Sequence, residues 1–300
     1  MEVLTQEKLA NYEKVEPPQT EKSNFHYSFS LLPKEERIAM HTVYAFCSYI
    51  DDIVDNSPNL NKKSILKKLD RLAWWENEIE NIYAGTVKST VMMPFVGIIN
   101  RFEIPKQYFL TLIDGVRRDL IQYRYQTFDE LKEYCYSVAS VVGLISVDIF
   151  GHKYEETKNY AINLGYALQL TNIIRDVKFD KDRGYIYLPL DELEKFNYSE
   201  ADLMGEVYND NFIDLMSFQA DRAREYYHKA RMNLKPDEKT TIVAAEIMDS
   251  IYFRLLEKIE LQDFNIFQPH KIRVSNTHKL MTTLKHWLSV NMFIRRFKKH

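Results

Sequence analysis

The 300-residue chain holds 43 acidic and 40 basic residues, so its formal net charge is −3. This balance gives no general signal for binding a polyanion such as DNA or RNA, and an apolar share of 45% is enough to fill a core. Only 8 glycines are present, which argues against many-stranded barrels and sandwiches. The two cysteines, Cys47 and Cys135, are too few for a disulfide framework or a cysteine zinc site.

The first 20 residues are charged and lack the apolar segment of a secretory signal. No window offers about 18 uninterrupted apolar residues, the length needed to cross a bilayer. We therefore expect a cytoplasmic protein, with peripheral membrane contact as an open alternative. The basic run Arg295, Arg296, Lys298 and Lys299 could contact anionic lipid, although a solvated helix end is the interpretation we favour.

Apolar residues recur at intervals close to 3.6 through most of the chain, which predicts helices. Because no linker or change of composition interrupts the pattern, we predict a single all-α domain over residues 1–300, with residues 1–20 peripheral. An irregular stretch at 180–189 is expected to form a lid near a site. The predicted helices cover residues 34–56, 60–84, 105–123, 128–150, 155–178, 211–234, 239–263 and 276–297.

Two of these predicted helices carry polar residues on one side although their other residues are mostly apolar. At about 100° per residue, each set falls within roughly 60–80° of the helix circumference. The first polar row consists of Tyr44, Ser48, Asp51 and Asp55, and the second polar row of Gln169, Asn172, Asp176 and Asp180.

Polar rows on otherwise apolar helices are costly unless their groups are satisfied. Carboxylates four residues apart repel one another, and a shared cation removes that repulsion. Oxygen ligands from Asp and Asn suit Mg²⁺, which usually binds together with substrate phosphates. One such row alone would usually be a solvated helix face. Two rows in apolar helices instead predict a Mg²⁺–diphosphate site across a helical bundle.

The residues around these rows resemble the squalene/phytoene synthase family, the head-to-head prenyl transferases, over about residues 25–280. The resemblance implies an all-α isoprenoid-synthase bundle around a central apolar cavity. The matching segments are FHYSFSLLP from Phe25, YAFC from Tyr44 with Asp51 and Asp55, YCYSVASVVG from Tyr134, LQLTNIIRD from Leu168, and YLP from Tyr187.

In terms of activity, the resemblance implies condensation of two farnesyl diphosphates to presqualene diphosphate, and on to squalene or dehydrosqualene. It implies two or three Mg²⁺ ions, and NADPH if the product is squalene. The segments AWWENEIENIYAG and YCYSVASVVGLISVDIFG look most like the bacterial squalene branch. The oligomeric state cannot be predicted.

The resemblance also implies roles for individual residues. Asp51, Asp55, Asn172, Asp176 and Asp180 match the metal site, and Gln169 matches a position lining the diphosphate site. The aromatic residues Phe25, Tyr44, Tyr134, Tyr187 and Tyr252 match positions around the allylic chains. Aromatic faces can stabilise an allylic cation, and a dry cavity protects it from water.

Two positions depart from the family pattern, which has an arginine where this chain has Ser48 and a second one where it has Tyr185. Both arginines would be expected to hold diphosphate. Arg175, Arg183 or Lys271 could supply the charge instead. The departures leave it open whether both half-reactions occur.

An apolar tunnel is needed for the two hydrocarbon chains. Candidates for its lining are Phe29, Val138, Ala139, Ser140, Val141, Val142, Gly143, Leu144, Ile145 and Leu168. Elsewhere, the segment DGVRRD beginning at Asp114 places Asp114 and Arg118 four residues apart. We expect an ion pair on a helix surface there.

Two alternatives stay open. One keeps the fold but takes two geranylgeranyl diphosphates and makes phytoene, because the sequence does not give the tunnel length. The other is a non-catalytic family member that acts as an assembly or lipid-carrier protein. Its weakness is that packing alone gives no reason for two polar rows on inner helices.

Overall fold

The computed structural model describes residues 24–55, 62–89 and 92–297, without the side chains of residues 24–26, 55 and 291–297. It confirms the predicted all-α fold, since the described residues contain no strand and only one isolated β-bridge, between Arg124 and Ile186. The α-helices are α2 (Asn24–Phe29), α3 (Lys34–Asp55), α4 (Lys62–Ala84), α5 (Met93–Phe102), α6 (Lys106–Arg118), α7 (Phe128–Cys135), α8 (Val141–Phe150), α9 (Glu156–Asp182), α10 (Leu190–Lys195), α11 (Glu200–Met204), α12 (Asp210–Met232), α13 (Val243–Glu260) and α14 (Asn276–Phe297).

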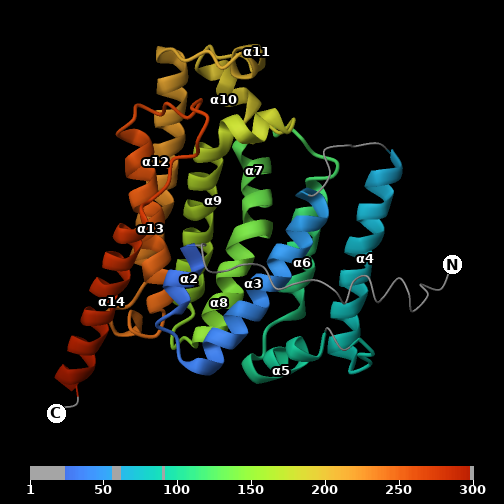
Figure 1. The fold of residues 1–300 in the computed structure, drawn as a ribbon, viewed down its shortest axis with the longest axis vertical. Coiled ribbons are helices and arrows are strands. Elements are labelled where there is room, and N and C mark those ends of the chain that lie inside the picture. The colour runs from blue at the N-terminus through green and yellow to red at the C-terminus, as the bar shows by residue number, and fades with distance from the viewer. Residues whose placement is uncertain (1–23, 56–61, 90–91, 298–300) are drawn as a thin grey trace.

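The long helices form a bundle in which α9 is central (Figure 1). Helix α9 packs against α12 on one side and against α8 on another, and it also contacts α13. Helices α10 and α11 lie at one end of the bundle, while α4 lies at the edge beside α6 and α3. Helix α14 packs on α13 and α2.

Residues 128–150 form one continuous helical stretch that includes a π-helical segment, η3 (Tyr136–Ser140), between α7 and α8. By length and composition alone this stretch could cross a membrane. In the bundle it contacts α6 and α9, and the buried side chains of α8 belong to the core. The sequence predicted a plain helix here, because nothing in its apolar pattern marks the extra residue of a π-turn.

Glycines allow the central helices to approach closely. A Cβ at Gly165 of α9 would lie 2.4 Å from the Cα of Ser140, and one at Gly143 of α8 would lie 2.7 Å from the carbonyl oxygen of Ala161. These contacts leave no room for a larger residue. They hold η3 and α8 directly against α9.

Several helix boundaries differ from the prediction. Helix α6 ends at Arg118 rather than near residue 123, and α9 continues to Asp182 instead of ending at 178. The irregular stretch therefore begins at Arg183, followed by Gly184 at a φ of 93°, a left-handed conformation that favours glycine. The short helices α2, α5, α10 and α11 were not predicted.

The buried apolar residues form two main clusters, one around α9, α12 and α13 and the other around α3, α4 and α6. Tyr136 and Phe150 pack against both clusters, so the stretch 128–150 connects the two halves of the core. The single domain over residues 1–300 stays a prediction, and residues 1–20 lie outside the described residues.

Candidate active site

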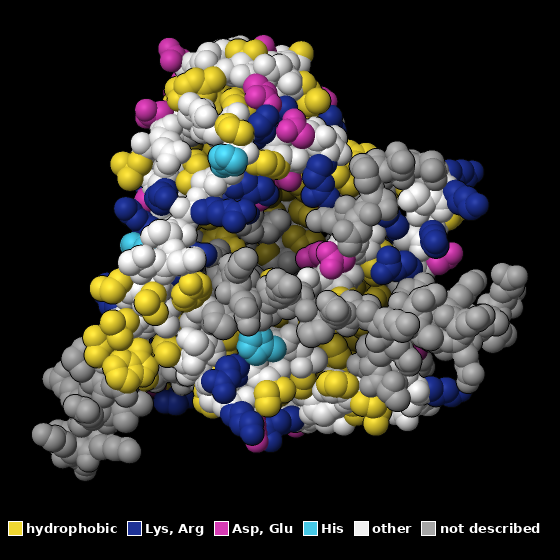
Figure 2. Space-filling view, in the orientation of Figure 1, with side chains coloured by type: hydrophobic (Ala, Val, Ile, Leu, Met, Phe, Trp, Pro, Cys, Tyr) yellow, Lys and Arg dark blue, Asp and Glu magenta, His cyan; other side chains and the backbone are white. Residues whose placement is uncertain are grey.

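Two adjoining cavities lie between α3, the stretch 128–150 and α9. The polar cavity is lined by acidic, basic and tyrosine side chains, and the apolar cavity by aliphatic and aromatic ones. Asp51, Val138, Gln169 and Asn172 line both, so the two cavities adjoin along these residues. The space-filling view shows this face hollowed near the middle, with Lys and Arg side chains on one side and Asp and Glu on the other (Figure 2).

Residues of both polar rows line the polar cavity. Asp51 comes from α3, and Asp176 and Asp180 come from α9. Asp51 is exposed to solvent at the mouth of the cavity, whereas Asp176 and Asp180 are half-buried. Asp51 therefore meets the second polar row at this cavity, but it is more exposed than its apolar surroundings indicated.

Asp176 is held by two cationic side chains. Arg175 donates to it through Nε and Nη2 at 2.7 and 2.6 Å, and Nζ of Lys271 lies 3.0 Å from Oδ2. Burial alone would raise the pKa of Asp176, but Arg175 and Lys271 hold it below its ordinary value. Asp176 is thus ionised at neutral pH.

Asp180, one turn further along α9, has the opposite environment. Burial and the neighbouring charge of Asp176 raise its pKa to about 7. A carboxylate that is costly to ionise in this way gains from a nearby cation. Of the two carboxylates in the second polar row, Asp180 would therefore be stabilised more by a bound cation than Asp176.

The donor set fits a hard divalent cation. Oδ1 of Asn172 is buried without a hydrogen-bond partner, while Nδ2 lies 3.5 Å from Oε1 of Gln169. Within the described residues, no three Asp, Glu, His or Cys side chains gather closely enough to enclose an ion by themselves. Mg²⁺ commonly takes one or two carboxylates and completes its shell with water and substrate phosphates. The cavity therefore suits a metal that arrives with a phosphorylated ligand.

A fourth acidic residue of the polar cavity, Asp119, was not predicted from the sequence, although it ends the DGVRRD segment. Tyr134 donates to its Oδ2 at 2.9 Å and Tyr187 to its Oδ1 at 3.0 Å. The hydroxyl of Tyr185 donates to its backbone oxygen at 2.8 Å. Because these partners come from α7 and from the loop after α9, no local spacing pointed to Asp119.

The expected pair between Asp114 and Arg118 does not form. Asp114 is paired with Arg117, three residues away, and Arg117 also contacts Glu76 at 2.6 Å. Arg118 lies 3.6 Å from Glu133 instead. The surface of α6 is charged as expected, but Asp114 and Arg118 are paired with other residues and not with each other.

Tyrosine rings form a stacked group at the polar cavity. Tyr187 is stacked on Tyr134 with centroids 5.3 Å apart and on Tyr185 with centroids 5.9 Å apart. Burial, together with the charge of Asp119, raises the pKa of the Tyr134 and Tyr187 hydroxyls well above the ordinary value. These tyrosines stay neutral and present ring faces that can stabilise a cation.

The predicted tunnel residues divide into two groups. Phe29, Val138, Ala139, Val142, Gly143 and Leu168 line the apolar cavity, together with Tyr44, Ser48 and Tyr252. Four other candidates are not among the lining residues: Val141, Leu144 and Ile145 are buried in the core, and Ser140 is buried with its hydroxyl bonded to the oxygen of Ile162. Apolar residues occur around the whole circumference of α8, so their pattern does not show which side faces the cavity.

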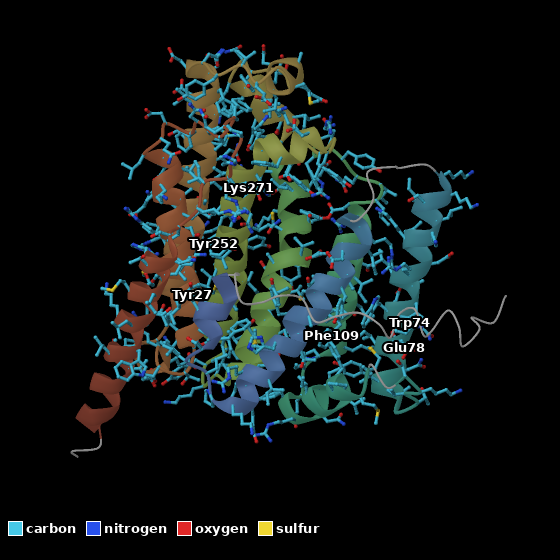
Figure 3. The ribbon with its side chains drawn as sticks, in the orientation of Figure 1. Tyr27, Trp74, Glu78, Phe109, Tyr252 and Lys271 are labelled. Atoms are coloured by element: carbon cyan, nitrogen blue, oxygen red, sulfur yellow. The ribbon has the colours of Figure 1, made fainter. Side chains whose placement is uncertain are left out.

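Three cationic side chains lie at the polar cavity. Arg175 and Arg183 line the polar cavity, and Lys271 reaches Asp176. The guanidinium of Arg183 lies 5.7 Å from the ring centroid of Tyr185. Lys271 lies nearer than Tyr252 to the end of the bundle capped by α10 and α11 (Figure 3). Tyr252 lines the apolar part, so the positive charge is concentrated at the polar part.

Two predicted site residues, Phe25 and Asp55, have side chains outside the described residues. Of the others, Tyr44, Ser48 and Tyr252 line the apolar cavity, Asp51, Gln169 and Asn172 line both, and Tyr134, Arg175, Asp176, Asp180, Arg183 and Tyr187 line the polar cavity. Lys271 joins the polar group through Asp176.

The chain is similar to known proteins over most of its length. The family model described as squalene/phytoene synthase matches residues 19–278. The chain is 37% identical over 259 residues to the phytoene synthase of Arthrospira platensis, covering 81% of each protein. It is 35% identical over 276 residues to the 15-cis-phytoene synthase of Synechocystis sp., covering 88% of this chain and 80% of that one.

Among solved structures, the fold is similar to that of a dehydrosqualene synthase in complex with a ligand. The TM-score is 0.77 at 25% sequence identity, and the match covers 96% of this chain and 99% of the other.

Proposed function

Because the chain belongs to the squalene/phytoene synthase family, whose members are prenyl transferases, we propose that it joins two geranylgeranyl diphosphates head to head into phytoene. The sequence alone favoured two farnesyl diphosphates. The phytoene synthases that are 35–37% identical to it favour the C20 substrate instead.

The observation that carries the proposal is the junction of the two cavities. An acidic and basic pocket suits a metal-bound diphosphate, and the adjoining apolar pocket suits a hydrocarbon chain. Asp51, Gln169 and Asn172 lie where the two meet. A prenyl diphosphate likewise consists of a charged diphosphate joined to an apolar hydrocarbon chain.

Mg²⁺ bound by Asp51, Asn172, Asp176 and Asp180, with Asp55 as a further predicted ligand, would act as a Lewis acid on the leaving diphosphate. The chain's own side chains act around it. Asp176 is kept ionised by Arg175 and Lys271, and those two cations, with Arg183, offset the negative charge of diphosphate.

The remaining residues protect and orient the hydrocarbon. The apolar cavity excludes water, which would quench an allylic cation. The stacked rings of Tyr134 and Tyr187 face the polar cavity, where the bond to diphosphate breaks. Asp119 fixes both hydroxyls, so the rings keep one orientation.

A second candidate is condensation of two farnesyl diphosphates to presqualene diphosphate and on to dehydrosqualene or, with NADPH, to squalene. The similarity to a dehydrosqualene synthase over 96% of the chain favours it. The two candidates share the polar cavity and differ in the chain length accepted by the apolar cavity.

A side-by-side assay decides between the candidates. The purified protein is incubated with Mg²⁺ and either geranylgeranyl or farnesyl diphosphate, with and without NADPH, and the lipids are identified by mass spectrometry. We expect a C40 product and faster diphosphate release from the C20 substrate. A C30 product alone would establish the second candidate, and no diphosphate release from either substrate would overturn both.

Asp176→Asn tests the role of the polar cavity. It keeps the shape of the side chain but removes the charge paired with Arg175 and Lys271, so turnover should fall to background. Asp214→Asn, an exposed acid on α12, is the matched control and should keep full activity. A fully active Asp176→Asn variant would contradict the proposed site.

A further inference from the structure

Helix α14 presents an apolar face to solvent. Leu280 is 58% exposed, Leu284 44% and Leu288 47%, and Met281 and Trp287 are 59% and 46% exposed. At about 100° per residue these five fall within roughly 120° of the helix circumference. Figure 2 shows hydrophobic side chains gathered at the lower left, over α14. We call these five residues the α14 face.

The opposite side of α14 is used for packing within the protein. Lys279 and Thr283 are buried, and His286 is hydrogen-bonded to Ser250 of α13 at 3.0 Å. The helix is therefore anchored on α13 and α2 through one side. The α14 face points away from that anchor, and solvent-exposed apolar patches of this kind commonly mark an interaction site.

The Lys, Arg, Asp and Glu residues in this part of the chain are all of the basic kind. Residues 264–300 contain 8 Lys and Arg and no Asp or Glu, whereas the first 263 residues contain 32 basic and 43 acidic residues. Arg273 and Lys285 are exposed among the described ones. A positive segment that also carries an exposed apolar helix face and a tryptophan has the composition of an interfacial helix on anionic lipid.

We propose that the α14 face docks on the surface of an anionic lipid bilayer, with its apolar side chains in the headgroup region and the exposed Arg273 and Lys285 close to the anionic headgroups. The side chains of the basic run Arg295, Arg296, Lys298 and Lys299, for which the sequence favoured a solvated helix end, lie outside the described residues.

The position of the α14 face would suit the release of a hydrocarbon product into the membrane. A surface groove beside α14 is lined by Trp287, Val290 and Phe150, among others, and Phe150 also lines the apolar cavity. Phe150 therefore lies between the reaction cavity and the groove. The membrane docking itself is independent of the proposed function, and only this route for the product rests on it.

Vesicle flotation of the full chain without substrate tests the docking. We expect the protein to float with phosphatidylcholine vesicles that contain phosphatidylglycerol and not with phosphatidylcholine alone. Binding should weaken strongly in about 1 M salt, where charges are screened within about 3 Å. Equal binding to both kinds of vesicle would overturn the role of charge, and no binding to anionic vesicles would overturn the proposal.

The combined variant Leu280→Gln, Leu284→Gln and Leu288→Gln keeps good helix formers and removes most of the apolar face. We expect its vesicle affinity to fall about tenfold or more. The matched control, Leu66→Gln, Met232→Gln and Leu261→Gln, changes three similarly exposed residues elsewhere and should bind like the unaltered chain. Equal binding of the two variants would contradict the assignment to α14.

Two further readouts separate the alternatives. Trp287 fluorescence should shift to the blue on anionic vesicles, and Trp287→Phe should abolish the shift, since Trp74 and Trp75 lie on α4. Size-exclusion chromatography tests whether a second copy covers the face. A dimer that the α14 variant dissociates, with no vesicle binding by either form, would overturn lipid as the occupant. These experiments contain no substrate, so they test membrane docking even if the protein does not catalyse the proposed reaction.

Discussion

The hydroxyl of Tyr134 donates a 2.9 Å hydrogen bond to Oδ2 of Asp119, and the hydroxyl of Tyr187 donates a 3.0 Å bond to Oδ1 of the same carboxylate. Both carboxylate oxygens of Asp119 are therefore engaged by tyrosines that border the polar cavity. Each tyrosine is largely buried, so its hydroxyl depends on this acceptor for satisfaction. Asp119 consequently sets the orientation of two aromatic faces in the site.

Replacing Asp119 with Ala should lower the free energy of unfolding by about 1–3 kcal/mol, the cost of leaving buried polar groups unsatisfied. Asp119→Asn should cost less, because an amide oxygen still accepts one bond. Urea unfolding followed by circular dichroism measures both. Asp114→Ala, at an exposed position of α6, which ends just before Asp119, should change stability by less than about 0.5 kcal/mol. Equal losses at the two positions would contradict a specific role for Asp119.

Lys271→Ala should raise KM for the prenyl diphosphate by about 10–100-fold, since hydrogen bonds to charged groups contribute about 1.5–3 kcal/mol. Lys271→Arg keeps the charge and should lose much less. Steady-state kinetics of diphosphate release gives KM and kcat separately. Lys67→Ala, an exposed lysine on α4, is the control. An unchanged KM for Lys271→Ala would show that Lys271 only positions Asp176.

The two polar rows could be predicted because helical spacing is a local property. Asn172, Asp176 and Asp180 lie on one side of any helix that contains them, whatever surrounds it. The apolar character of α3 and α9 then predicted that the rows face a protein interior, and in the structure the described residues of both rows line the two adjoining cavities. How exposed Asp51 is depends on where α3 ends relative to its neighbours, which the sequence does not encode locally.

Asp119 could not be predicted for a related reason. Its partners Tyr134, Tyr185 and Tyr187 come from α7 and from the loop after α9, so only the tertiary fold brings them together. The lining of the apolar cavity was predicted only in part. Apolar residues occur all around α8, so the 3.6-residue period does not show which side of the helix faces the cavity. The π-helical segment before α8 rotates the following residues further.

Gly165→Ala should destabilise the bundle by about 1–3 kcal/mol. The added Cβ would lie 2.4 Å from the Cα of Ser140, which is backbone and cannot rotate away. Helix α9 would have to move from η3, where both border the apolar cavity. Gly97→Ala is the control, because a Cβ there meets nothing within 4 Å. It lies inside α5 and should stabilise the protein by about 0.5–1 kcal/mol. Urea unfolding that ranks the two variants in the reverse order would contradict the close-packing argument.

His286 should make the stability of the protein depend on mildly acidic pH. Burial and the nearby charge of Lys285 lower its pKa below 6.5, Lys239 acts in the same direction, and Asp249 opposes them. The folded state therefore favours the neutral ring that bonds to Ser250. As the pH falls below 6.5, the unfolded chain binds a proton that the folded chain resists, so the stabilisation present above that pH is lost.

Thermal unfolding of the unaltered chain and of His286→Gln between pH 8 and pH 5, a range of about three units around the ordinary histidine pKa, tests this prediction. Glutamine can keep a hydrogen bond to Ser250 but does not titrate. The unaltered chain should lose more of its melting temperature toward pH 5 than His286→Gln does, because the contact between α13 and α14 weakens when the ring is protonated. Parallel pH profiles would place the acid sensitivity elsewhere, whereas a steeper profile for His286→Gln would mean that protonation of His286 stabilises the fold.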